Sequence, residues 1–142
     1  MKKALVDVSV VLDVLLDRQP HAKASSAVWS AIETGSSQGL LAAHAVTTIH
    51  YLIRRELGEV KARRAISRIL MVFGVAMVDG TVIQEALQLS LSDFEDSVTV
   101  AAAELAGCEY IVTRDPRGFR GSPIRTLTPE AALPLLLTSG AR

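Results

Sequence analysis

The sequence predicts an α/β fold of three layers, in which helices cover both faces of a central parallel sheet. Short apolar, β-prone runs alternate along the chain with longer segments whose apolar residues recur at helical spacing. This alternation is typical of parallel strands joined by crossover helices. With 142 residues the chain is long enough to bury a substantial core, and we expect residues 1–142 to form a single domain.

The expected strands are short and follow one another at regular intervals along the chain. They lie at residues 3–6, 40–43, 74–78, 110–113 and 124–127. Apolar or β-branched residues predominate in each run, and Gly, Asp or Pro residues lie close to their ends. The first strand runs directly into Asp7, and the fourth is followed closely by Asp115. Both side chains are therefore expected at the carboxyl edge of the sheet, where open α/β folds build their sites.

The segments between the strands predict helices. They lie at residues 10–17, 20–35, 44–57, 59–71, 82–89, 92–106 and 129–137. Ser9 is the expected N-cap of the first helix, and Asp79 or Thr81 that of the fifth. Residues 138–142 are expected to fray, as chain ends commonly do.

The sixth helix has the most informative sequence. Ser92 and Glu95 have the S-x-x-E spacing of a capping box, which places Asp93 and Asp96 in the first turn. Gly107 is placed to end the helix. The expected core-facing stripe consists of Phe94, Val98, Ala101 and Leu105.

Composition limits the possible functions. Fifteen basic and fifteen acidic residues leave a formal charge of zero, so any contact with nucleic acid must use a local basic patch. Hydrophobic residues make up 49% of the chain, but the longest apolar runs are too short or too interrupted to cross a bilayer. The surplus of apolar residues therefore indicates a protein interface. The single cysteine, Cys108, fits a reducing compartment, and we expect the protein in the cytoplasm.

Three aspartates, Asp7, Asp96 and Asp115, are expected at the same edge of the sheet. Carboxylates held close together repel one another unless a cation lies among them, and oxygen ligands suit Mg²⁺ or Mn²⁺. Such an ion can activate water and stabilise the charge that develops on phosphorus during phosphodiester cleavage. The alternative is that these residues simply end strands and favour a helix N-terminus.

Three segments carry a resemblance to a known family. They are LVDVSVVLDVLLD at residues 5–17, DFEDSVTVAAAELAGCEYIVTRD at residues 93–115, and LTPEAAL at residues 127–133. Together they resemble the PIN domain, in particular the small prokaryotic type found as the toxin of type II toxin–antitoxin pairs. The resemblance implies a Mg²⁺- or Mn²⁺-dependent ribonuclease with a parallel sheet, commonly a homodimer and silenced by an antitoxin protein.

The resemblance also implies roles for individual residues. Asp7 matches the first metal-binding Asp of the family, and Asp96 matches the Asp of the second helical motif. Asp115 matches the acid or amide that follows the T-R pair, and Thr113 matches the Thr or Ser beside it. Ser9 stands where the family usually has Asn.

The chain departs from the family pattern at two positions. Thr48 stands where the family normally has a Glu on the helix after the second strand, and Gly118 precedes Phe119 where a further Asp is usual. Asp93 is close enough in sequence to serve the metal site, although an acid at a helix N-terminus explains it equally well. An alternative to the enzyme is therefore a PIN fold with weakened catalysis that binds RNA or protein.

A basic cluster lies on two consecutive expected helices. It consists of Arg54, Arg55, Arg63, Arg64 and Arg68. We consider it either a track for the RNA backbone or a solvated helix face. A third function class, the phosphoacceptor receiver domain, requires a Lys near the end of the last strand, and no Lys follows Lys61.

Overall fold

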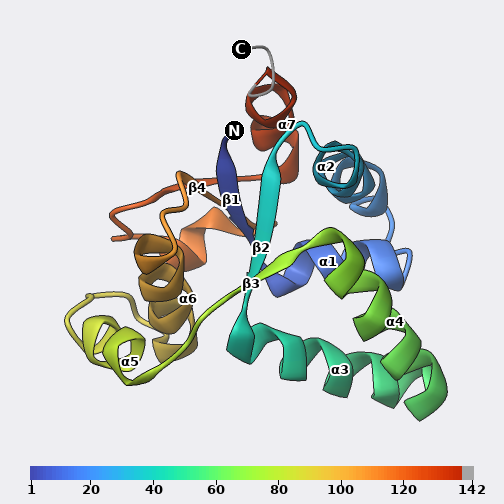
Figure 1. The fold of residues 1–142 in the computed structure, drawn as a ribbon, viewed down its shortest axis with the longest axis horizontal. Helices are drawn as coiled ribbons and strands as arrows, with labels where there is room; N and C mark the ends of the chain where they lie inside the picture. The colour runs from blue at the N-terminus through green and yellow to red at the C-terminus, as the bar shows by residue number, and fades with distance from the viewer. Residues whose placement is uncertain (139–142) are drawn as a thin grey trace.

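The computed structural model describes residues 1–138, which form one parallel sheet of five strands in the order β3-β2-β1-β4-β5 (Figure 1). The strands are β1 (Lys3–Val6), β2 (Gln38–Ala42), β3 (Gly74–Ala76), β4 (Tyr110–Val112) and β5 (Arg125–Leu127). All neighbouring strands pair in parallel, and β1 lies in the centre between β2 and β4. The predicted α/β fold with a parallel sheet is therefore confirmed.

Helices follow the strands as the sequence predicts. They are α1 (Val8–Leu15), α2 (Ala22–Glu33), α3 (Ala43–Leu57), α4 (Glu59–Val72), α5 (Gly80–Leu87), α6 (Phe94–Leu105) and α7 (Pro129–Thr138). Figure 1 shows α5 and α6 on one side of the sheet and α2, α3, α4 and α7 on the other. The result is a three-layer arrangement with the sheet in the middle.

The central strand β1 divides the core into two halves. Its side chains alternate, so that Ala4 and Val6 pack with α1, α2, α3, α4 and α7, whereas Leu5 packs with α5 and α6. All three side chains are almost completely buried. This burial on both faces explains why the strand is a continuous apolar run with no polar alternation.

Two of the predicted helix caps are wrong by one or two positions. The N-cap of α1 is Asp7, and Ser9 lies inside the first turn of that helix. The N-cap of α6 is Asp93, whose Oδ1 accepts a hydrogen bond from the backbone N–H of Asp96 at 3.0 Å. Asp93 serves as the cap in place of Ser92 because its carboxylate reaches the N–H three residues ahead. Of the two predicted caps for α5, Asp79 is the one observed.

The predicted core stripe of α6 is correct only in its middle. Val98 and Ala101 are buried, but Phe94 is 50% exposed and Leu105 is 56% exposed. Every residue from 97 to 103 is buried, because the middle of the helix is covered on several sides while both ends protrude. Gly107, with φ of 77°, follows the end of the helix as predicted.

The remaining differences lie near the chain end. The predicted loop at residues 118–123 begins as part of a short 3₁₀ turn, η1 (Pro116–Phe119). Thr138, predicted to fray, is the last residue of α7, and residues 139–142 lie outside the described part. No helix within residues 1–138 is both long enough and apolar enough to span a membrane.

Candidate active site

The site is built where β1 and β4 end side by side. Val6 pairs with Val112 across the two parallel strands, so the next residues, Asp7 and Thr113, emerge at the same edge. Thr113 Oγ1 donates a hydrogen bond to Asp7 Oδ2 at 2.8 Å, and Ser9 Oγ donates to the same oxygen at 3.0 Å. The two hydroxyl groups therefore fix the orientation of the Asp7 carboxylate.

A cavity of about 240 Å³ opens in front of this carboxylate. It is lined by Asp7, Ser9, Asp96, Thr113, Arg114, Asp115, Gly118 and Phe119. The first turn of α6 supplies Asp96, and the segment after β4 supplies Asp115. The structure thus brings together the three aspartates that the sequence places at one sheet edge.

The environment of Asp96 is strongly acidic. Partial burial, which is the largest effect, and the nearby carboxylates of Asp93, Asp7, Glu95 and Asp115 together raise the pKa of its carboxyl from 3.8 to about 6. The charged groups that raise the pKa of Asp96 are all carboxylates. This is the electrostatic condition in which a bound cation is most favourable.

Asp115 lies at the open side of the cavity. Its side chain is 64% exposed, and Oδ1 accepts a hydrogen bond from Arg117 Nε at 3.2 Å. Its backbone N–H donates to Thr113 Oγ1 at 3.3 Å, which links it to the Asp7 network. Asp115 is consequently the most exposed of the three carboxylates.

Two of the predicted site residues lie outside the lining of this cavity. Asp93 is occupied as the N-cap of α6, and it influences the cavity through its charge on Asp96. Thr48 lies on α3, where its Oγ1 donates to the carbonyl of His44 at 3.4 Å, one turn back in the same helix. Neither side chain makes a hydrogen bond to Asp7 or Asp115 within residues 1–138.

The glycine at position 118 faces the acidic centre. A Cβ atom at Gly118 would lie 3.5 Å from Asp96 Oδ2, an ordinary van der Waals distance. A carboxylate at this position would therefore stand directly beside Asp96. The absence of an acid here removes one negative charge from a group that is already crowded with them.

Sequence reasoning missed Arg114 and Asp13. Arg114 lines the acidic cavity, and its Nε donates to the fully buried Asp13 at 2.9 Å. The available signal was an Asp within the apolar face of the first helix, since a buried carboxylate requires a partner.

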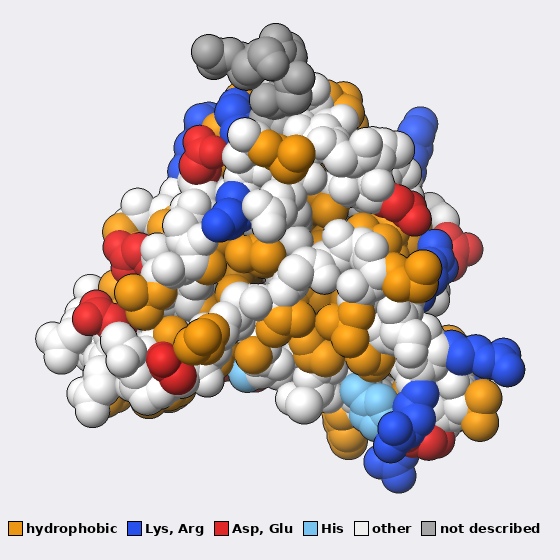
Figure 2. All heavy atoms as spheres, in the orientation of Figure 1, with side chains coloured by type: hydrophobic (Ala, Val, Ile, Leu, Met, Phe, Trp, Pro, Cys, Tyr) orange, Lys and Arg blue, Asp and Glu red, His pale blue; other side chains and the backbone are white. Residues whose placement is uncertain are grey.

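The predicted basic cluster lies away from the acidic cavity. Its members are Arg54, Arg55, Arg63, Arg64 and Arg68, none of which lines that cavity. Figure 2 shows basic side chains gathered over the far ends of α3 and α4. Within the cluster, Arg54 and Arg63 pair with Glu59, and Arg68 lies over the ring of Trp29 at 5.3 Å. Part of its charge is therefore already used in local contacts.

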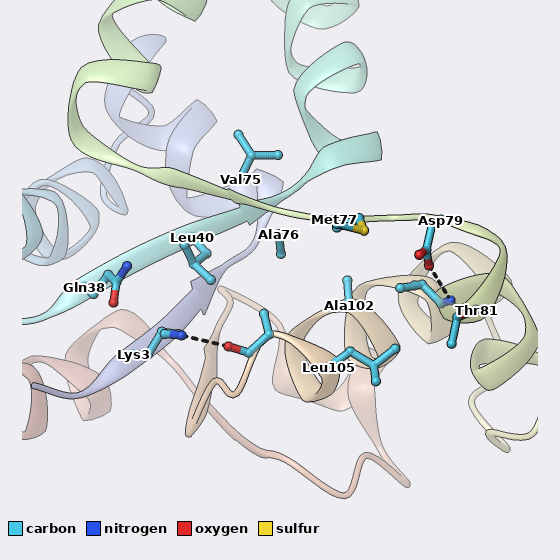
Figure 3. A pocket seen from close by; sticks show the side chains of 12 residues that line it. Lys3, Gln38, Leu40, Val75, Ala76, Met77, Asp79, Thr81, Ala102 and Leu105 are labelled. Carbon is cyan, nitrogen blue, oxygen red and sulfur yellow. Dashed lines mark hydrogen bonds between the residues drawn. The ribbon is translucent and has the colours of Figure 1, made fainter.

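A larger cavity of about 430 Å³ lies between the β3 edge and α6. Its lining is mainly apolar and includes Leu40, Val75, Met77 and Leu105 (Figure 3). In Figure 3, Lys3 points across it and donates a hydrogen bond to the carbonyl of Ala106 at 2.8 Å. None of the three aspartates lines this cavity, so it offers no comparable set of oxygen ligands.

The donor set of the acidic cavity suits a hard divalent cation. Carboxylate and hydroxyl oxygens predominate there, and neighbouring carboxylates raise the pKa of Asp96. In residues 1–138, however, no three His, Cys, Asp or Glu side chains lie close enough together to hold a metal ion as they stand. A cation here would need a small inward movement of a carboxylate, or bridging waters.

Solved structures from several bacteria share this architecture. The structure of the toxin VapC20 from Mycobacterium tuberculosis has a TM-score of 0.67 at 15% identity, and the match covers 82% of this chain and 92% of that one. The structure of FitAcB from Neisseria gonorrhoeae has a TM-score of 0.71 at 18% identity, and the match covers 89% of this chain and 98% of that one. At this level of identity the similarity shows a common fold.

Sequence comparison identifies the family. Ribonuclease VapC1 of Aquifex aeolicus is 22% identical over 134 residues, which cover 91% of this chain and 92% of that protein. The profile of the PIN domain matches residues 3–117, which include β1 to β4 and all the aspartates of the acidic cavity. The chain therefore belongs to the PIN domain family.

Proposed function

We propose that this protein is a metal-dependent endoribonuclease that cleaves single-stranded or structured RNA, and that it acts as the toxin of a toxin–antitoxin pair. The observation that carries the proposal is the acidic cavity, which Asp7, Asp96 and Asp115 line together and in which burial and neighbouring carboxylates raise the pKa of Asp96 to about 6. The curated relative named a ribonuclease supports the same reaction class.

Within this proposal, Asp7, Asp96 and Asp115 would hold Mg²⁺ or Mn²⁺. The ion, when bound, would supply activation of water and stabilisation of the negative charge that builds on phosphorus. Thr113 and Ser9 position Asp7 by donating to Oδ2, and the other carboxylate oxygen would be available to the ion. Asp96 is held at the N-terminus of α6 by the Asp93 cap.

The partners of the protein are proposed from its relatives. Solved structures of the same fold include a toxin–antitoxin complex from Klebsiella pneumoniae and a DNA-bound VapBC from Salmonella typhimurium. We infer a cognate antitoxin protein, a homodimer and a cytoplasmic location for this chain. Exposed apolar side chains such as Met71, Met77 and Leu87 provide surface for such contacts.

A second candidate function is a PIN-fold module with weakened catalysis that binds RNA or protein. Two observations favour it, namely Thr48 at the position where the family normally has Glu, and the lack of a preformed group of three metal-binding side chains in the described residues. An uncharged hydroxyl contributes less to cation affinity than a carboxylate does.

Cleavage of labelled RNA tests the proposal. Wild type should cleave single-stranded RNA in Mn²⁺ or Mg²⁺ and not in EDTA, and Asp7→Asn should lose this activity. Glu85→Gln is the matched control, because Glu85 is an exposed acid on α5 outside the cavity. Cleavage that survives EDTA, or that Asp7→Asn leaves unchanged, would contradict the proposed site.

The same assay separates the enzyme from the weakened module. If wild type binds RNA without cleaving it, while Thr48→Glu gains metal-dependent cleavage, the module is the correct description. If wild type already cleaves and Thr48→Glu adds to the rate, the remaining acids suffice for catalysis. A Thr48→Glu variant that only loses thermal stability would show that position 48 packs against the protein and does not face the site.

A further inference from the structure

The acidic cavity contains one side chain of opposite charge. Arg114, between Thr113 and Asp115, lines the cavity together with Asp7 and Asp96. Its Nε donates to Asp13 Oδ2 at 2.9 Å, and its backbone N–H donates to Ser9 Oγ at 3.3 Å. The arginine is thus fixed at both its backbone and its side chain.

The partner of Arg114 is unusually well buried for a charged residue. Asp13 on α1 has no solvent exposure, and its Oδ2 also accepts a hydrogen bond from Ser25 Oγ at 3.2 Å. Oδ1 is buried and has no hydrogen-bond partner within residues 1–138. Arg114 is the one cation in the described chain that pairs with this carboxylate. Such burial is costly, and the pair holds the arginine rigidly in place.

The pair with Asp13 leaves much of the guanidinium unused. The Arg114 side chain is 33% exposed, and apart from Asp13 no described residue accepts a hydrogen bond from it. A guanidinium carries five N–H donors in a planar fork, which match the oxygens of a phosphate group. Donors therefore remain available at the wall of the acidic cavity.

Among the described residues, the Arg114 side chain forms an ion pair with Asp13 and with none of the three aspartates of the cavity. Asp7, Asp96 and Asp115 nevertheless line the same cavity as Arg114. The positive charge of Arg114 is balanced by Asp13 behind it. The cavity therefore presents two distinct regions, an acidic one suited to a cation and a single guanidinium suited to an anion.

We propose that Arg114 binds a phosphodiester group of the RNA in this cavity, and that Asp13 is the positioning residue that orients it. This inference rests on the proposed ribonuclease function and names the protein group that receives the substrate phosphate. A cavity lined by carboxylates alone would repel a phosphodiester, so a fixed donor beside a bound cation would hold the phosphate against that repulsion. The oxygens of the phosphate that do not bridge to sugars are the acceptors.

Paired substitutions distinguish this role from a purely structural one. Arg114→Gln alone leaves the buried Asp13 without its cation, so it should lower the melting temperature. The double variant Asp13→Asn/Arg114→Gln removes both charges and should recover most of that stability. If Arg114 serves RNA, the double variant should remain defective in RNA binding although its fold is restored.

RNA affinity is measured by fluorescence anisotropy of a single-stranded oligoribonucleotide in Ca²⁺, which supplies a cation to the acidic cavity, under conditions in which gel electrophoresis shows that the RNA stays intact. Relative to wild type, we expect roughly tenfold weaker binding by the double variant, the size of one lost charge-assisted contact. The slope of log affinity against log salt should flatten by about 0.7, the value for one phosphate contact on a single strand. Arg120→Gln is the control, an exposed arginine of the same loop that does not line the cavity.

Arg114→Lys provides a second variant in case the double variant does not fold. Its single ammonium can keep the pair with Asp13 but leaves no fork for phosphate. For Arg114→Lys we expect a melting temperature close to that of wild type and RNA binding that is several-fold weaker. A folded Arg114→Lys or double variant with wild-type affinity and salt slope would overturn the proposal. If wild type binds RNA through Arg114 yet never cleaves it, the phosphate contact stands and the proposed enzymatic function fails.

Discussion

At the scale of single residues, hydroxyl groups organise the acidic cavity as much as carboxylates do. Thr113 is almost fully buried and its hydroxyl has two bonds, one to Asp7 Oδ2 and one from the backbone N–H of Asp115. Ser9 likewise connects Asp7 with the backbone of Arg114. The hydroxyls therefore join the ends of β1 and β4 into one rigid unit.

The raised pKa of Asp96 predicts how stability depends on pH. Its folded-state pKa of about 6 exceeds the ordinary value of 3.8, so the protonated form is favoured in the folded protein. The contribution of protonated Asp96 to the free energy of unfolding is fully present below pH 3.8 and is lost as pH rises through about 6. Since the side chain is partly exposed, we expect a loss of about 1 kcal/mol in the free energy of unfolding.

Urea denaturation across this pH range measures the effect, with Asp96→Asn as the comparison. The variant carries no titrating group at this position, so its free energy of unfolding should fall less than that of wild type as pH rises from 3.8 to about 6. Addition of Mg²⁺ should reduce the loss of stability that wild type shows as pH rises, because a cation stabilises the ionised carboxylate. Identical pH profiles for the two proteins would mean that Asp96 is not held among uncompensated acids.

Individual site residues were predictable to different degrees. Asp7 and Asp115 could be placed at the sheet edge because each follows a short strand, and the structure puts both at the cavity. The pairing of Asp13 with Arg114 could not be predicted, because the two residues are separated by 101 positions and meet only in the folded chain. An Asp in an apolar helix face indicates a buried partner but does not say which residue it is.

At the scale of secondary-structure elements, α6 has two functions. Its buried middle joins the sheet to α5, and its first turn presents Asp96 to the cavity. The sequence placed this helix correctly but assigned its cap to Ser92, because Ser92 and Glu95 satisfy the spacing of a capping box. Asp93 also suits the N-cap position, because its carboxylate can accept a hydrogen bond from the N–H three residues ahead. The path of the chain before the helix decides whether Ser92 or Asp93 is the cap.

Helix α4 carries Arg63, Arg64 and Arg68 of the basic cluster, and the effect of charge reversal decides whether the cluster is a track for the RNA backbone or a solvated helix face. Arg64 is exposed with no ion pair among the described residues, whereas Arg63 pairs with Glu59. Reversal of both to Glu should weaken binding of single-stranded RNA. It should also flatten the slope of log affinity against log salt by up to about 1.4, or 0.7 for each lost phosphate contact.

Lys23→Glu is the control for this charge reversal, because Lys23 is exposed on α2 and lies outside the basic cluster. Anisotropy titrations at several salt concentrations give the slope, and circular dichroism confirms that α4 is intact. If the reversed protein keeps the wild-type slope, the cluster is an ordinary solvated helix face and the RNA follows another path.

At the scale of the whole molecule, the site is assembled from segments that are distant in sequence. Asp7, Asp96 and Asp115 line one cavity because β1 lies in the centre of the sheet beside β4, with α6 packed against it. The alternation of strands and helices predicts the layers and the parallel sheet, but it does not determine the order β3-β2-β1-β4-β5. That order depends on which helices share each face, which is a matter of long-range packing.

The central claim is that these three carboxylates form one cation site, and calorimetric titration with Mn²⁺ tests it most directly. Wild type should bind Mn²⁺, and Asp96→Asn should bind it at least about tenfold more weakly, with Glu85→Gln unchanged. A thermal melt first shows that each protein is folded. Addition of Mn²⁺ should raise the melting temperature of wild type, and it should raise that of Asp96→Asn much less. Equal Mn²⁺ binding by wild type and Asp96→Asn, or no binding by either, would contradict the claim.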